Sequence, residues 1–252
     1  MNNSFHTFSL SQEGLFLLEK SRKIRICNFI QIKSVIIDKD TDIETYKLEY
    51  RRRNTNELNT RIIKSEDIQK NNILSLSKYG VDINDNNKSL VSEYLSTSLQ
   101  TAPIKITLNG YGWTQYKSQK LFIGDTILSA APTKESLINN AKKLDLAPHG
   151  YIEAWLTMYN EYILGNAYLE LAVVFGLSAP IINYLYESYP DLATILIHIS
   201  GDSTAGKSTA SMLAVSTAGN PNQISSKSLM RKWSGTENSI MAILEDISGV
   251  PI

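Results

Sequence analysis

The 252-residue sequence predicts an α/β protein in two parts. A strand-rich α+β region spans residues 1–147, and residues 148–252 hold a helical lead-in followed by the first part of an α/β core. Three observations predict this organisation. Strand-forming residues alternate through the first hundred positions, and helical periodicity replaces them after Thr133. Late in the chain, the spacing G-x-x-x-x-G-K-S at 201–208 lies between an apolar run and a helix-like segment.

The composition is that of a soluble globular protein, with 42% hydrophobic residues. Its 25 basic and 25 acidic residues cancel, so any contact with nucleic acid must be local. Cys27 is the only cysteine, which excludes an internal disulfide and predicts a buried thiol in a reducing compartment. Residues 1–14 are polar and lack the layout of a secretion signal, so we expect a cytoplasmic protein.

In the N-terminal part, β-branched and aromatic residues cluster between turn-forming residues, which predicts antiparallel strands. Leu90, Val91, Tyr94, Leu95 and Leu99 recur at helical spacing, which predicts one amphipathic helix before the chain returns to strands. The predicted strands cover 14–19, 23–38, 43–53 and the stretch 104–128.

Two features of this part have alternative interpretations. The run Arg51–Arg53 is flanked by glutamates, which favours a solvated strand edge over a binding patch. Gly110 and Gly112 mark a turn or bulge, and Trp113 beside them is expected in the core of a small sheet. Base stacking by Trp113 or Tyr111 is the alternative to packing.

After Thr133 the sequence predicts helices. A short polar-faced helix is expected over 134–144, and a stripe of apolar residues predicts a second over 152–163, capped by Gly165-Asn166. The uncharged stretch 171–185 is shorter than a membrane span and is interrupted by Pro180 and Asn183. We therefore expect a buried core helix, broken near the proline, and no membrane partner.

The glycine-rich spacing predicts a phosphate-binding loop, because its context fits. The run 193–199 is apolar and β-branched, as in a central parallel strand, with His198 packed within it, and 207–218 reads as a helix ending before Gly219. Backbone N–H groups of such a loop can point at phosphates, and the helix N-terminus adds positive partial charge. Lys207 is expected to reach the β- and γ-phosphates of ATP as the catalytic residue, and the Ser208 hydroxyl to ligate Mg²⁺. The predicted nucleotide-binding residues are Gly201, Asp202, Ser203, Thr204, Ala205, Gly206, Lys207, Ser208 and Thr209. A Gly/Ser-rich surface turn is the alternative.

Hydrolysis of ATP by proteins with such a loop also needs an acidic residue at the end of a second strand. Residues 237–246 read as a helix, and the apolar run that begins at 249 reaches Ile252 without an acid after it. Glu245 and Asp246 precede that run. We therefore expect the catalytic acid beyond Ile252, and weak nucleotide binding with little hydrolysis by this chain alone. His6 and His149 have no partners at metal-binding spacing, so no transition-metal site is predicted.

Five ordered stretches carry a resemblance to a known family. They are "FSLSQEGLFLL", "GYGW", "GNAYLELAVVFGLSAPII", "IHISGDSTAGKSTASMLAVSTAGNP" and "WSGTENSIMAILEDISGVPI". Together they resemble a domain-of-unknown-function family described as superfamily II helicase-like proteins and inactivated derivatives. Its members occur in phages, plasmids and cassette-type mobile elements, whose replicative helicases are described as MCM-like AAA+ motors.

The resemblance implies the ATPase domain of a DNA helicase or replication initiator, acting on DNA as a homo-oligomeric ring. It also implies that the sensor and arginine finger lie beyond Ile252. Trp233, Thr236 and Asn238 match recurring family positions without an assigned role, and helix capping is the simplest role for Thr236. Arg231 and Lys232 are interpreted as a solvated basic pair, with DNA contact as the alternative.

Two other functions fit the loop. A small-molecule phosphotransferase is one, although such enzymes commonly begin with their phosphate-loop strand. A nucleotide-binding regulator that does not hydrolyse ATP is the other.

Overall fold

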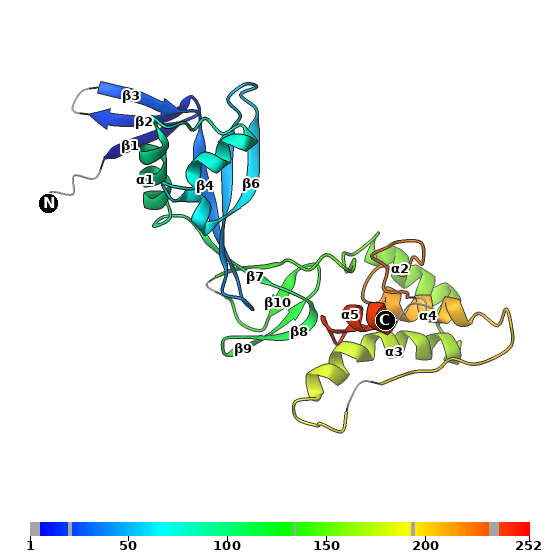
Figure 1. The fold of residues 1–252 in the computed structure, drawn as a ribbon. Coiled ribbons are helices and arrows are strands. Elements are labelled where there is room, and N and C mark those ends of the chain that lie inside the picture. Colours follow the sequence, from blue (N-terminus) through cyan, green and yellow to red (C-terminus); the bar gives the residue numbers. More distant parts are fainter. Residues whose placement is uncertain (1–5, 20–21, 134, 193–194, 232–236) are drawn as a thin grey trace. The chain divides into compact units, whose positions relative to one another are not determined.

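The computed structural model describes residues 6–19, 22–133, 135–192, 195–231 and 237–252 (Figure 1). The protein is a mixed α/β chain, as predicted, and it divides into two compact units, Met1–Thr107 and Leu108–Ile252. This division lies earlier than the predicted boundary at 147. The reason is that Tyr111 and Leu144, expected in the first domain, share a core with Val215 and Leu229 of the second. We call the two parts unit 1 and unit 2 and describe each by itself.

Unit 1 is built mainly from strands in two sheets. In one sheet β2 pairs antiparallel with both β1 and β3. In the other, β7, β4, β5 and β6 lie side by side in that order, antiparallel except for the parallel β4–β7 pair. The strands are β1 (Thr7–Ser11), β2 (Gly14–Glu19), β3 (Arg22–Cys27), β4 (Ile30–Asp38), β5 (Glu44–Arg51), β6 (Leu58–Lys64) and β7 (Ile104–Leu108). The single strand predicted over 23–38 is thus two strands, separated by a turn at Asn28.

Three helical segments complete unit 1: η1 (Ser65–Ile68), η2 (Ile73–Tyr79) and α1 (Lys88–Ser98). Helix α1 confirms the periodicity read from the sequence, because Val91 and Leu95 are fully buried in the core with Leu48 of β5. Cys27 lies in the same core with 1% of its surface exposed, which confirms the buried thiol. Burial, and secondarily the charge of Asp82, raises the pKa of Cys27 to about 12.

Unit 2 contains a small sheet with the strand order β10-β9-β8-β12. Its strands are β8 (Tyr111–Tyr116), β9 (Gln119–Ile123), β10 (Ile127–Ser129) and β12 (Ile247–Ser248), and β11 (Ser136–Asn139) follows β10 in the chain. Strand β12 pairs parallel with β8, whereas the other neighbours in the sheet are antiparallel.

The two glycines predicted to mark a turn or bulge lie beside β12. A Cβ atom on Gly112 would lie 1.5 Å from the carbonyl oxygen of Ser248, and one on Gly110 would lie 2.9 Å from that of Asp246. Both glycines also have positive φ, at 85° and 109°. Glycine is therefore required here because the backbone of β12 approaches closely.

The helix predicted over 134–144 is wrong. Residues 136–139 form a strand, and Lys134 lies outside the described residues. Two asparagines explain the difference, since the Asn139 side chain accepts from the Ala141 N–H and donates to the Gly124 carbonyl. The Asn140 N–H donates to the Leu108 carbonyl. These bonds take the place of the helical hydrogen bonds of this segment.

The helices of unit 2 are α2 (Ile152–Met158), the π-helical turn η3 (Tyr159–Ile163), α3 (Ala167–Leu185), α4 (Lys207–Ser216) and α5 (Glu237–Leu244). Asn166 caps the start of α3 by accepting from the Leu169 N–H, whereas the sequence predicted the Gly165-Asn166 pair as the cap at the end of the preceding helix. Helix α5 ends at Leu244 rather than at Asp246, because β12 begins two residues after Glu245.

Helix α3 differs from the expectation of a buried helix broken near Pro180. It continues through Pro180 to Leu185. The indole Nε1 of Trp113 donates to the Pro180 carbonyl at 2.7 Å, which ties α3 to β8 at the proline. The helix is also largely exposed. It is long and apolar enough to cross a membrane by length and composition alone, with a mean hydropathy of 1.5 and 17% of that window buried, a test that core helices of soluble proteins also pass.

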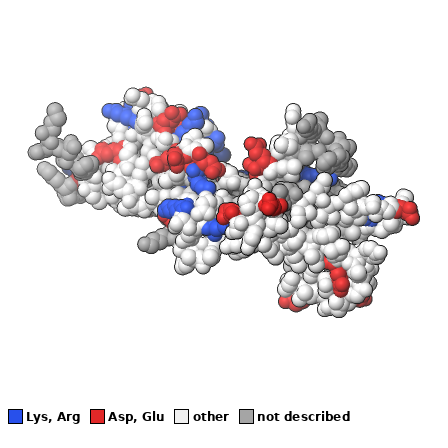
Figure 2. All heavy atoms as spheres, turned by 90° about the horizontal axis from the view of Figure 1, so that it is seen from below, with Lys and Arg blue, Asp and Glu red and all other residues white. Residues whose placement is uncertain are grey.

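Charge is unevenly distributed between the two units. Unit 1 has more basic than acidic residues, and unit 2 has more acidic than basic residues, although the whole chain is neutral. On the face seen in Figure 2, charged side chains gather over unit 1, whereas most of the surface of unit 2 there carries neither sign.

Candidate functional site

The residues of the predicted phosphate loop form one exposed turn leading into α4. Gly201 and Gly206 have φ values of 148° and 79°, and Thr204 between them also has a positive φ, at 67°. Three residues with positive φ in so short a stretch make the backbone curl back on itself. All residues from Gly201 to Gly206 are exposed, and no atom lies within 4 Å of a Cβ built on Gly206.

Helix α4 begins directly at Lys207, with Gly206 as its N-cap residue in the left-handed conformation. The first hydrogen bond of the helix joins the Ala210 N–H to the Gly206 carbonyl. The N–H groups of the first turn, which include those of Ser208 and Thr209, therefore have no acceptor within the helix and face the loop. Such N–H groups, together with the positive end of the helix, favour an anionic group at this point.

The Lys207 side chain bends back over the loop. Its Nζ atom donates to the Gly201 carbonyl at 2.9 Å and to the Asp202 carbonyl at 2.6 Å. The ammonium group is therefore held against the backbone at the start of the loop. The structure thus brings the predicted residues 201–209 together into one loop-and-helix unit.

The buried parallel strand predicted before the loop is wrong for the residues that the structure describes. Residues 195–200 form neither helix nor strand, and Leu196 is 85% exposed. His198 is exposed rather than packed, and Ala193 and Thr194 lie outside the described residues. The physical reason is the lack of a partner, because no strand in the described part of the chain pairs with this segment. Its apolar side chains consequently have no sheet on which to be buried.

The packing of α4 against α3 fixes the body of the helix. A Cβ atom on Gly176 of α3 would lie 2.0 Å from the Ala214 carbonyl oxygen and 2.5 Å from Thr217 Oγ1. The two helices therefore approach closely at Gly176, and Val215 of α4 is buried in the core of unit 2.

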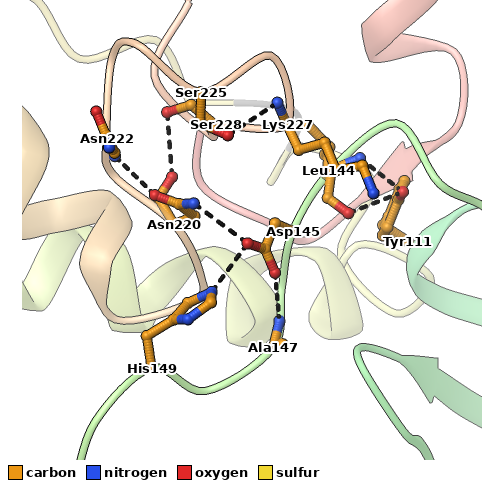
Figure 3. A network of polar contacts seen from close by, with 10 residues as sticks. All are labelled: Tyr111, Leu144, Asp145, Ala147, His149, Asn220, Asn222, Ser225, Lys227 and Ser228. Atoms are coloured by element: carbon orange, nitrogen blue, oxygen red, sulfur yellow. Dashed lines mark hydrogen bonds and ion pairs between the residues drawn. The ribbon is translucent and has the colours of Figure 1, made fainter.

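The segment after α4 is held by a polar network centred on Asp145 (Figure 3). The Asp145 carbonyl accepts from the Asn220 N–H at 2.9 Å, and the Asp145 N–H donates to the Lys227 carbonyl at 2.9 Å. The Asp145 carboxylate accepts from Asn220 Nδ2 at 3.2 Å and lies 2.9 Å from His149 Nε2. The hydrogen bond from His149, followed by that from Asn220, lowers the pKa of Asp145.

Neighbouring hydrogen bonds extend this network to the small sheet. The Tyr111 hydroxyl accepts from the Leu144 N–H at 2.7 Å and donates to the Leu144 carbonyl at 3.2 Å. Sequence reasoning missed the network, because Asp145 and Asn220 are far apart in the chain and His149 was considered only as a metal ligand. The local sequence there predicts only that the helix over 207–218 ends before Gly219.

Other residues singled out in the sequence have structural roles. Trp113 packs edge to face on Phe122, with ring centroids 5.1 Å apart, and tilted against Tyr184, which confirms packing over base stacking. Arg231 donates to the carbonyls of Ser226 and Lys143 rather than standing free in solvent.

The structure describes only one of the other residues that the sequence singled out near α5. Lys232, Trp233 and Thr236 lie outside the described residues, and Asn238 is exposed. Within the described ranges, no group of three or more His, Cys, Asp or Glu residues is placed to hold a metal ion.

Comparison with known protein families shows to which family the chain belongs. The family model described as "Domain of unknown function (DUF927)" matches residues 8–252. The chain belongs to the DUF927 family. Among solved structures, this DUF927 chain is similar to one titled "SCCmec type IV Cch - active helicase", with 29% sequence identity and a TM-score of 0.72. The match covers 96% of this chain and 46% of the helicase chain, so the DUF927 chain spans about half the length of that helicase. A search of curated proteins found no match.

These matches confirm the predicted resemblance at the level of the family, namely a domain of unknown function related to a helicase. The similarity extends over both units of the DUF927 chain rather than over the glycine-rich loop alone.

Proposed function

We propose that this chain is the ATP-binding portion of a mobile-element or phage DNA helicase or replication-initiator ATPase. The observation that carries the proposal is the loop at 201–209. Its left-handed backbone positions lead into the N-terminus of α4, with the Lys207 ammonium against the backbone at the start of the loop. The similarity of nearly the whole chain to an active helicase supports the same proposal.

The loop residues fit the phosphates of a nucleotide. The space above Gly206 is open, and the nearest atom to a Cβ on Gly201 would be the Ala205 Cβ at 3.9 Å, so phosphate oxygens could approach the backbone. Lys207 would exchange its two carbonyl acceptors for phosphate oxygens, and the Ser208 hydroxyl would face Mg²⁺. Bound MgATP would supply the free energy of phosphate-bond hydrolysis.

More specifically, we propose that the complete protein is an AAA+ motor of the MCM-like type, which works as a homo-oligomeric ring on DNA in the cytoplasm. Such motors need a catalytic acid, a sensor and an arginine finger besides the phosphate loop. Asp246, the last acidic residue of this chain, is paired with Lys143 and stands before β12. We assign the three missing parts to the portion of a complete protein that corresponds to the other half of the solved helicase.

The segment before the loop has the composition of a strand, although its described residues form none in this structure. Ile195, Leu196, Ile197 and Ile199 are exposed, as is natural for a segment whose neighbouring strands are supplied by the rest of a motor core. Pairing of these residues with such strands would bury them and align the loop.

Unwinding of a forked DNA duplex by the complete gene product tests the proposal. We expect ATP hydrolysis that DNA stimulates, and strand separation that Lys207→Ala abolishes. A complete protein that hydrolyses ATP but neither binds nor unwinds DNA would contradict the helicase assignment. Stoichiometric phosphate transfer to a nucleoside or sugar would instead favour the phosphotransferase.

A further inference from the structure

One face of the larger sheet of unit 1 is distinct from the face that packs on the core. Along β5, the side chains of Tyr46, Leu48 and Tyr50 are buried in the core of the unit. Because side chains alternate along a strand, Thr45, Lys47 and Glu49 point to the opposite face. We call this second face the lysine face.

The register of the strands places lysines across this face. Lys105 of β7 pairs with Ile36 of β4, Ile36 pairs with Thr45 of β5, and Thr45 pairs with Lys64 of β6. Lys105 and Lys64 therefore lie at the two ends of a row of paired residues that crosses four strands. At the usual strand spacing their backbones are about 14 Å apart. In the next row Lys47 lies between Ser34 and Ile62.

Two acidic residues of these four strands lie on this face, Asp38 and Glu49. Asp38 follows Ile36 by two positions in β4, and its carboxylate accepts from the Asp40 and Thr41 N–H groups. The buried carboxylate of Glu49 accepts from Lys33 Nζ at 2.8 Å and from Gln31 Nε2 at 2.7 Å. The hydrogen bond from Lys33 is the main cause of the lowered pKa of Glu49. The charges of Lys33 and Glu49 therefore largely neutralise each other.

Lys64 lies 3.5 Å from Glu66, but both side chains are mostly exposed, and such a pair is weak. The charge of Lys47 also contributes to the lowered pKa of Glu49. Lys64 is exposed and Lys47 and Lys105 are half-buried, so their long side chains can still contact an anionic partner.

The remaining side chains of the lysine face indicate which polyanion it fits. The four strands are all described, and their only aromatic residues, Tyr46 and Tyr50, point into the core. The face therefore has no ring on which an unpaired base could stack, which is the usual means of holding single strands. The exposed hydroxyl of Thr60 among the separated lysines can donate to a phosphate oxygen, a contact that reads no base sequence.

We propose that the lysine face binds the phosphate backbone of duplex DNA through Lys47, Lys64 and Lys105. The charge of the face complements the polyanion, and unit 1 has an excess of basic residues that the neutral net charge of the chain conceals. This inference deepens the proposed function, since a helicase must hold duplex ahead of the strands it separates. It rests on the sheet of unit 1 and not on the nucleotide loop.

The test compares the full chain with a triple variant, Lys47→Ala, Lys64→Ala and Lys105→Ala. Fluorescence anisotropy of a labelled 20-base-pair duplex of arbitrary sequence is measured over a range of salt concentrations, without nucleotide. Each lost phosphate contact should reduce the slope of log K against log salt by roughly 0.9, so the triple variant should lose about 2–3 units of slope. Its affinity in low salt should fall roughly tenfold or more.

A matched triple variant, Lys23→Ala, Lys70→Ala and Lys88→Ala, removes the same charge elsewhere in unit 1 and should keep the wild-type slope. The buried thiol of Cys27 reports the folding of unit 1, because it reacts with a thiol reagent only when that core opens. A triple variant that folds by this criterion and keeps wild-type affinity would overturn the proposal. Equal loss in the matched variant would overturn it as well.

Further measurements separate this proposal from its alternatives and from the nucleotide site. Tighter binding to a single-stranded 20-mer than to the duplex, or binding to anionic phospholipid vesicles in place of DNA, would refute the assignment to duplex DNA. Lys207→Ala should leave duplex binding unchanged, because that residue lies in unit 2. Loss of ATP binding in Lys207→Ala would therefore not contradict duplex binding by the lysine face. Loss of duplex binding in the triple variant would likewise not contradict the nucleotide site.

Discussion

Replacement of Gly112 by alanine should destabilise unit 2 strongly. Two costs combine at this position. Its φ of 85° costs an L-residue about 1–2 kcal/mol. The new Cβ would also lie 1.5 Å from the Ser248 carbonyl oxygen, so β12 must move away from β8. An overpacked site of this kind typically costs a further 1–3 kcal/mol. We therefore expect Gly112→Ala to lower the free energy of unfolding by about 2–5 kcal/mol.

Two other glycines of unit 2 separate these costs. Gly150 has a φ of 81° but no atom within 4 Å of an added Cβ, so Gly150→Ala should show the backbone cost alone, about 1–2 kcal/mol. Gly124 has neither a positive φ nor a contact closer than 3.5 Å, so Gly124→Ala should stay within about 1 kcal/mol of wild type.

Urea unfolding followed by tryptophan fluorescence measures all three variants. The three tryptophans of the chain all follow residue 107, so their emission reports unit 2 and not unit 1. Equal destabilisation by Gly112→Ala and Gly150→Ala would refute the reasoning, because it would mean that β12 does not lie against Gly112.

Two further predictions concern the network after α4. The depressed pKa of Asp145 means that its ionised form stabilises the fold, so this contribution is present at neutral pH and is lost as the pH falls below the ordinary aspartate pKa of about 4 and through the lowered pKa of the folded state. The unfolding midpoint of unit 2 should therefore fall less with pH in Asp145→Asn than in wild type, and an unchanged pH dependence would contradict the assigned role. Tyr111→Phe removes a buried hydroxyl that both accepts from and donates to Leu144, and it should cost about 1–3 kcal/mol in the same urea assay. A cost below about 0.5 kcal/mol would indicate that water replaces the hydroxyl.

The sequence predicted elements well where the pattern is local. Strand β2 has the predicted bounds, and α4 begins at the predicted Lys207 after the glycine-rich turn. Helix α1 was found because its buried residues repeat at helical spacing. In each case neighbouring residues alone determine the signal, since alternation, periodicity and glycine at positive φ do not depend on distant partners.

Predictions failed where distant residues decide the conformation. The segment 195–199 has strand composition, but composition does not supply the neighbouring strand that a sheet needs. The helix expected over 134–144 gives way to a strand and turn held by asparagine side chains. The exposure of α3 and the polar network of Asp145 both depend on packing between segments that are far apart in the sequence. The division of the chain after Thr107, which differs from the boundary predicted at 147, also depends on distant residues, because Tyr111 joins the core of the later helices.

The most direct test of the central claim is ATP binding by this chain and by its Lys207→Ala variant. Titration with a fluorescent ATP analogue in the presence of Mg²⁺ compares both with Lys142→Ala, which removes an exposed lysine of unit 2 outside the loop. Loss of a charged hydrogen bond to phosphate costs about 1.5–3 kcal/mol, so Lys207→Ala should weaken binding roughly 10- to 150-fold while Lys142→Ala binds as wild type. Unchanged affinity in Lys207→Ala would contradict the assignment of residues 201–209 as the nucleotide site.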